Sequence, residues 1–130
     1  MATTTVTVTD ANFEQTVSDG VVLIDFWAAW CGPCRAFAPV FEAAAARHPD
    51  VVFGKIDTEA EPGLAREFGI SAIPTLMVLR DGIVLGAQPG VMSARSIDDL
   101  IRQVKALDMD ALRRTVADRD AAAGAAAAAR

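Results

Sequence analysis

Hydrophobic and polar positions along the chain predict strands and helices in alternation. Residues 4–8 alternate threonine and valine, which is typical of a strand with one exposed face. Residues 21–27 and 51–57 are apolar at most positions, as expected of strands that are buried on both faces. Between them, residues 33–47 carry apolar side chains at helical spacing. A strand, a helix and a second strand within about forty residues predict a right-handed crossover with parallel strands.

The rest of the pattern completes a mixed sheet with helices on both faces. It predicts a short helix over residues 62–68 and a hairpin of two strands over residues 75–80 and 83–87. A final amphipathic helix follows over residues 93–107. Another short helix contains Phe13 and Val17, and we expect Asp10 to cap it. Either Ser93 or Ser96 can cap the final helix. The predicted fold class is therefore α/β.

The composition changes near residue 107. We expect residues 1–107 to form one domain and residues 108–130 to be a C-terminal extension, with a short helix over 109–119 followed by an alanine-rich disordered tail. The alternative is that this helix docks a partner. Its apolar side would consist of Met109, Leu112 and Val116.

Composition and charge narrow the classes of partner. The chain has 130 residues, of which 52% are hydrophobic, so it has enough apolar residues for a folded core. A net charge of −5 argues against nucleic acids and anionic membranes as general partners. Residues 1–5 lack a basic segment followed by an apolar run, and the alanine run 125–129 is too short to span a bilayer. We therefore expect a cytoplasmic protein.

The two cysteines are the strongest chemical signal in the sequence. Cys31 and Cys34 are the only cysteines, and a disulfide between them closes a very small ring. Loop entropy gives such a ring roughly 2 kcal/mol of stabilisation, against about 3 kcal/mol for a 15-residue loop. Two thiols are also only half of a structural zinc site, and the sequence has no second pair of cysteines or histidines. Reversible thiol–disulfide exchange is the leading hypothesis, and no metal site is expected.

The predicted elements assign different roles to the two thiols. Cys31 follows a strand and begins a helix, where free backbone amides and the helix dipole favour a thiolate. Cys34 lies one helical turn later, so we expect Cys31 to attack and Cys34 to resolve. Asp25 interrupts a buried strand, and burial raises the pKa of a carboxylate toward the working pH, which makes it a candidate proton acceptor for Cys34. Lys55 in the neighbouring strand can partly oppose that rise. The alternative is that Asp25 and Lys55 form only a structural ion pair.

These residues resemble the thioredoxin family over about residues 4–107. The resemblance depends chiefly on the sequence DFWAAWCGPC, from Asp25 to Cys34, and on Ile73-Pro74-Thr75 some forty residues later. Further matches are Pro39, Lys55, Gly82 and Gly90. Three features depart from the family pattern: Pro89 before Gly90, arginine rather than lysine at position 35, and the extension.

The resemblance implies a central mixed five-stranded sheet flanked by four helices, with a cis peptide bond before Pro74. It also implies that the backbone of Ile73 pairs with the substrate in a shallow apolar groove. The residues expected to line this groove are Trp30, Gly32, Pro33, Ala72, Ile73, Pro74, Gly90 and Val91. Without the resemblance, Pro74 is a strand-entry proline and Trp30 a partly packed core residue.

The resemblance further implies a monomeric reductant of many disulfide-containing client proteins. No cofactor is bound, and a thioredoxin reductase returns the oxidised form to the dithiol with electrons from NADPH. Two other classes of function stay open. A redox-independent binding module would use only the groove, and a thiol oxidase or isomerase would work in an oxidising compartment. The pair Gly32-Pro33 and the absence of a signal sequence argue against the latter.

Overall fold

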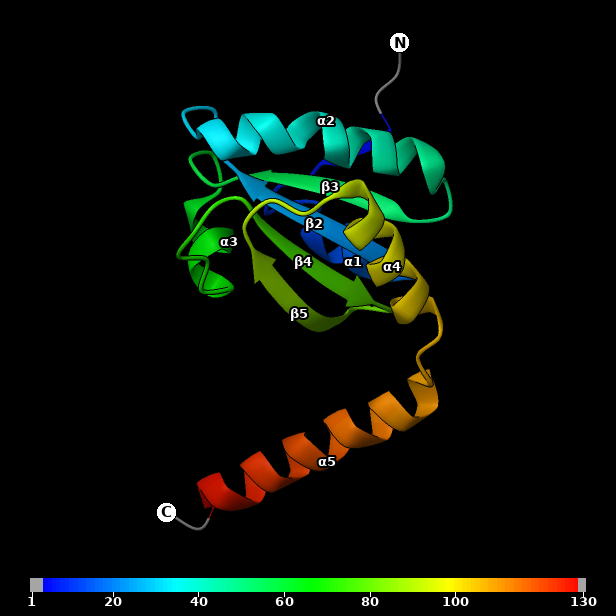
Figure 1. Cartoon of the computed structure of the whole chain (residues 1–130). Helices are drawn as coiled ribbons and strands as arrows, with labels where there is room; N and C mark the ends of the chain where they lie inside the picture. Colours follow the sequence, from blue (N-terminus) through cyan, green and yellow to red (C-terminus); the bar gives the residue numbers. More distant parts are fainter. Residues whose placement is uncertain (1–3, 129–130) are drawn as a thin grey trace.

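The computed structural model describes residues 4–128, which form a five-stranded sheet and the helices around it (Figure 1). The strands lie in the order β1-β3-β2-β4-β5. Strands β1, β3 and β2 are parallel, while β4 runs antiparallel to β2 and β5 antiparallel to β4. Their bounds are β1 Thr5–Thr7, β2 Val21–Trp27, β3 Val52–Asp57, β4 Thr75–Arg80 and β5 Ile83–Pro89. The mixed five-stranded sheet predicted from the sequence is therefore confirmed.

Four helices cover the sheet and a fifth follows them within the described residues. Their bounds are α1 Phe13–Val17, α2 Gly32–Arg47, α3 Pro62–Glu67, α4 Ala94–Lys105 and α5 Met109–Ala128. The core under α2 and α4 includes Leu23, Phe41 and Ile97. The core under α1 and α3 includes Ile24 and Leu64. Successive residues of β2 thus enter opposite cores, as the pleat of a strand requires, so β2 is buried on both faces.

The start of helix α1 differs from the prediction, whereas the start of α4 agrees with it. Asp10 does not cap α1, because the chain makes a further turn before the helix and Asn12 precedes it. The Asn12 side chain folds back to accept a hydrogen bond from the Thr9 backbone amide, at 2.8 Å. For α4 the structure selects Ser93 from the two candidates, since its hydroxyl accepts a hydrogen bond from the Ser96 amide at 3.1 Å.

The C-terminal extension is more helical than the sequence analysis predicts. Helix α5 does not end near residue 119 but continues to Ala128, through most of the segment expected to be disordered. Alanine has the highest intrinsic helix propensity, and Asp108 accepts a hydrogen bond from the Ala111 amide at the first turn. Residues 129 and 130 lie outside the described part of the chain. The domain boundary near residue 107 stays a prediction.

The first turns of α5 contact the domain, while residues 121–125 of the same helix do not. Met109 is buried, Leu112 and Val116 are half-buried, and residues 121–125 are exposed. Arg113 forms an ion pair of 3.0 Å with Asp81 in the turn between β4 and β5. Figure 1 shows α5 leading away below the sheet.

Side chains packed closely against β3 leave room only for glycine at position 54. A Cβ atom there would lie 2.6 Å from Val8 Cγ2 and 2.7 Å from Ile24 Cδ1. We expect Gly54→Ala to lower the free energy of unfolding by about 1–3 kcal/mol, the usual cost of overpacking a core. Urea denaturation measures this change. Gly63→Ala is the control, because a Cβ at Gly63 meets nothing within 4 Å, and an equal loss in both variants would contradict the packing argument.

Candidate functional site

The two cysteines lie where the central strand β2 passes into helix α2. Cys31 is the N-cap residue of α2, with extended backbone angles (φ −86°, ψ 111°), and Pro33 occupies the first turn, where its missing amide costs nothing. The cysteines form a disulfide, with Cα atoms 5.2 Å apart. The structure is therefore that of the oxidised protein, and it has no other cysteine.

The start of α2 favours negative charge on Cys31. Its Sγ accepts a hydrogen bond from the Cys34 backbone amide, at 3.2 Å. After reduction, the same amide and the positive end of the helix dipole stabilise a thiolate at this atom. Cys31 and Cys34 are 4% and 2% exposed, so both cysteines are buried in the oxidised protein.

A second loop brings backbone groups to the disulfide. The Ile73–Pro74 peptide bond is cis, as the family resemblance implies. Cys31 Sγ lies 3.7 Å from the carbonyl oxygen of Ile73. The Gly90 amide donates a hydrogen bond of 2.8 Å to the Pro74 carbonyl, and Gly90 has a positive φ of 95°. Ile73 therefore lies beside Cys31 Sγ, and the hydrogen bond between Pro74 and Gly90 joins the two neighbouring loops.

The other residues predicted for the groove are exposed around this centre. Trp30 is 67% exposed and Val91 is 53% exposed. Gly32, Pro33 and Ala72 are also exposed. These positions leave a free surface next to the disulfide that another polypeptide can reach.

The orientation of Trp30 depends on a residue that the sequence analysis did not identify. The indole Nε1 of Trp30 donates a hydrogen bond of 2.7 Å to Glu59 Oε1. Glu59 lies in the turn after β3, where its own amide donates to Asp57 Oδ1 at 2.9 Å. Nothing in the local sequence marks Glu59 for this role, because the contact joins segments 29 residues apart.

Asp25 is the one fully buried carboxylate among the described residues. It lies in β2 on the face covered by α2, since it is two residues after Leu23, which packs in that core. Its Cα pairs across the strands with Lys55 in β3. Neither carboxylate oxygen has a hydrogen-bond partner among residues 4–128. The ion-pair alternative therefore lacks a direct contact, and Lys55 Nζ instead lies 4.9 Å from the centre of the Trp27 ring.

Burial dominates the electrostatics of Asp25. Loss of hydration raises its pKa from 3.8 to about 6, while the positive charge of Lys55 partly opposes the rise. A carboxyl group with this pKa exchanges its proton close to neutral pH, as the sequence analysis expects of a proton acceptor.

In the part of the chain that the structure describes, no three histidine, cysteine, aspartate or glutamate side chains lie together in a way that could hold a metal ion. Within residues 4–128, no helix combines the length and apolarity needed to cross a membrane.

Together the fold and the disulfide define a thiol–disulfide oxidoreductase. The thioredoxin family model matches residues 4–106. The chain is 55% identical over 123 residues to putative thioredoxin 2 of Streptomyces coelicolor, covering 94% of this chain and 92% of that protein. It is 43% identical over 94 residues to thioredoxin of Chlamydia muridarum, covering 72% and 92%. The solved structure of thioredoxin Mala s 13 from Malassezia sympodialis is 34% identical, with a TM-score of 0.67 and coverage of 76% and 89%.

The chain belongs to the thioredoxin family. Its function is that of a protein-disulfide oxidoreductase acting on disulfide-containing client proteins. Thioredoxins carry no bound cofactor, and the redox-active group is the disulfide itself. The fold and family inferred from sequence are therefore confirmed.

The pKa of Asp25 predicts a specific dependence of stability on pH. Because the folded protein holds this proton more tightly than the unfolded chain, the stabilising contribution of Asp25 falls as the pH rises from about 4 through about 6, and it is lost by about pH 7. The interval from 3.8 to about 6 corresponds to about 3 kcal/mol. Asp25→Asn should therefore become more stable relative to the parent protein by about this amount between pH 4 and pH 7.

Urea denaturation of both oxidised proteins across this pH range measures the difference. Asp10→Asn is the control, because Asp10 is exposed on a loop. A difference between Asp25→Asn and the parent protein that stays constant with pH would contradict the assigned cause.

Proposed function

We propose that Cys31 is the attacking thiol, that Cys34 is the resolving thiol, and that Asp25 accepts the Cys34 proton. The observation that carries this assignment is the position of Cys31 as N-cap of α2, beside the Ile73–Pro74 loop. It supports Cys31 as the nucleophile because the helix start stabilises a thiolate there and the neighbouring surface is exposed. Cys34 lies one turn inside the helix.

The reaction proceeds in two exchanges. The Cys31 thiolate attacks one sulfur of a client disulfide, a bond forms between Cys31 and the client, and the other client sulfur leaves as a thiolate. Cys34 then loses its proton and attacks Cys31, forming the Cys31–Cys34 disulfide and releasing the second client thiolate. The client gains two electrons and the dithiol loses two.

Asp25 and Lys55 have separate parts in the second exchange. A carboxylate with a pKa near 6 is largely ionised at neutral pH and can take up the proton that Cys34 releases. Lys55 keeps this pKa from rising further, so it is a positioning residue that acts through Asp25. Burial of the carboxylate thus costs stability and supplies a base beneath α2.

The surface around the disulfide supports binding of an extended client segment. We propose that the backbone of Ile73 pairs with the client and that Trp30, Gly32, Pro33, Ala72, Pro74, Gly90 and Val91 line the groove. Main-chain pairing depends little on sequence, which suits a reductant of many proteins. Glu59 joins this group as a positioning residue, because it holds the Trp30 indole.

The oxidised protein must be reduced again for the cycle to continue. We propose a thioredoxin reductase that uses NADPH, a monomeric carrier and a cytoplasmic location. A compartment that keeps thiols reduced suits a dithiol that donates electrons.

Two serine variants test the assignment of the thiols. Cys31→Ser should abolish reduction of insulin disulfides by the dithiothreitol-reduced protein, because serine cannot form the mixed disulfide. Cys34→Ser should still attack but remain bound to insulin through Cys31, since the resolving thiol is missing. Turbidity of the released insulin B chain measures reduction, and non-reducing mass spectrometry measures the mixed disulfide. Undiminished activity of Cys31→Ser, or trapping of insulin through Cys34, would overturn the assignment.

A further inference from the structure

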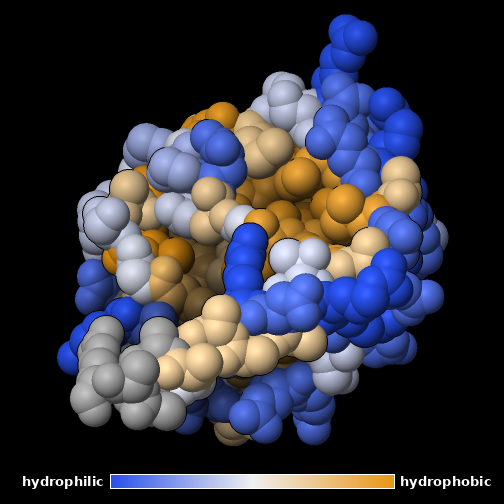
Figure 2. All heavy atoms as spheres, turned by 90° about the horizontal axis from the view of Figure 1, so that it is seen from below, coloured by the Kyte–Doolittle hydropathy of each residue, from blue (hydrophilic) through white to orange (hydrophobic). Residues whose placement is uncertain are grey.

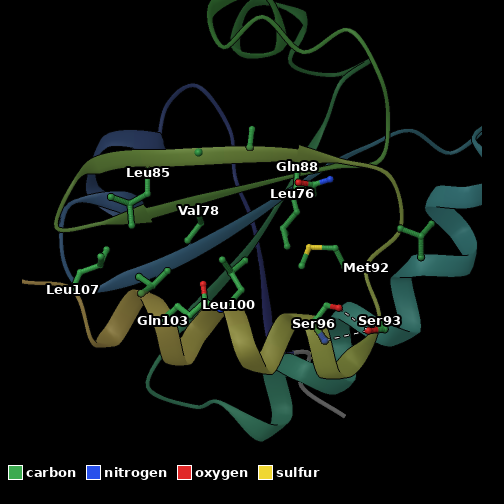
Figure 3. A pocket seen from close by; sticks show the side chains of 14 residues that line it. Leu76, Val78, Leu85, Gln88, Met92, Ser93, Ser96, Leu100, Gln103 and Leu107 are labelled. Carbon is green, nitrogen blue, oxygen red and sulfur yellow. Dashed lines mark hydrogen bonds between the residues drawn. The ribbon is translucent and has the colours of Figure 1, made fainter.

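An apolar groove separates strand β5 from helix α4. It encloses about 570 Å³, within the range typical of ligand-binding clefts. In Figure 3, Leu85 and Val78 project from the sheet toward Leu100 and Gln103 of α4. Figure 2, which views the molecule from below, shows apolar side chains gathered in a hollow on this face. The groove is therefore open to solvent and is bounded by β5 on one side and α4 on the other.

The lining of the groove selects against charged occupants. Aspartate, glutamate, lysine and arginine make up 22% of the chain, yet none of the described residues that line the groove is charged. The polar groups at its margin are neutral, for example those of Gln88, Ser93 and Gln103. An uncharged apolar surface rimmed by neutral polar groups is typical of a site for a hydrophobic polypeptide segment.

One end of the groove adjoins the dithiol surface. Val91 lines the groove and also belongs to the surface proposed to contact clients. The preceding residue, Gly90, donates its amide to the Pro74 carbonyl, and the neighbouring Ile73 carbonyl lies 3.7 Å from Cys31 Sγ. Figure 3 shows Met92 at this end of the groove and Leu107 at the other. A client segment leaving Cys31 past Val91 therefore meets the groove next.

We propose that this groove between β5 and α4 binds an uncharged apolar segment of the client protein whose disulfide is being reduced. The inference rests on the proposed client surface and extends it away from the sulfurs. Binding there adds affinity for protein disulfides and none for small disulfides, which reach only Cys31. The groove thus makes the protein prefer polypeptide substrates.

Two neighbouring residues of β5 provide a matched test. Leu85 is half-buried and lines the groove, whereas Val84 is 45% exposed and does not. Leu85→Glu introduces a carboxylate that an apolar client segment would have to desolvate. We expect it to lower the second-order rate constant for insulin reduction about ten-fold, the effect of about 1.4 kcal/mol. Reduction of 5,5′-dithiobis(2-nitrobenzoate) should not change, and Val84→Glu should change neither rate.

Gln103→Glu adds a second variant in case Leu85→Glu folds poorly. Gln103 is exposed on α4, and the substitution adds a charge at constant size, so we expect a smaller loss with insulin alone. All proteins are used at full length and reduced with dithiothreitol, and thermal unfolding checks their folding. If the parent protein reduced neither disulfide, the proposed function itself would fail.

The proposal is overturned if both groove variants, correctly folded, reduce insulin at the parent rate. It is also overturned if they lose activity equally on both disulfides. Unchanged insulin reduction with a lower thermal midpoint would assign the groove to packing within the chain. Sedimentation that shows a parent dimer and a monomeric Leu85→Glu would assign it to a second copy.

Discussion

The short connection from β2 to α2 is the constraint on which the rest of the site depends. Strand β2 is the central strand and is buried on both faces, so its end is held firmly against the two cores. Cys31 lies four residues after Trp27, the last residue of β2, and is the N-cap residue of α2. The sulfur is thereby fixed at a helix start, where backbone amides and the helix dipole favour a thiolate. It also lies against the Ile73–Pro74 loop, the place where we propose that a client chain binds.

The same strand explains why the site carries a buried acid. A carboxylate at Asp25 costs stability because no described residue hydrogen-bonds to it, and Lys55 faces it across the strands without direct contact. Burial that opposes folding also brings the pKa close to neutral, where a proton acceptor is most useful. An unpaired buried carboxylate is the kind of local exception found at functional positions, which supports the role proposed for Asp25 as proton acceptor.

Sequence alone predicted the sheet, the four packed helices and the position of both cysteines, because these follow from apolar periodicity and helix-start chemistry. The cis bond before Pro74 came only from family resemblance. The Trp30–Glu59 hydrogen bond and the groove between β5 and α4 arise from contacts between distant segments, which periodicity does not encode. The start of α1 at Asn12 follows instead from a local turn over residues 9–12, which the capping preference of Asp10 did not reveal. Helix α5 was underestimated because an alanine run has little apolar pattern but a strong helical propensity. The alignment with the Streptomyces coelicolor relative covers 94% of the whole chain and reaches into α5, so at least part of the extension is shared with that protein.

The reduction potential of the Cys31–Cys34 couple tests the central claim most directly. The start of α2 stabilises the Cys31 thiolate. Even so, the Cys31–Cys34 dithiol must be a stronger reductant than the thiols that it produces in its client proteins. Equilibration of the full-length protein with glutathione buffers at pH 7, with the two forms separated by mass, gives the value. The account predicts a potential more negative than about −200 mV, and a more oxidising value would indicate an oxidase or isomerase instead.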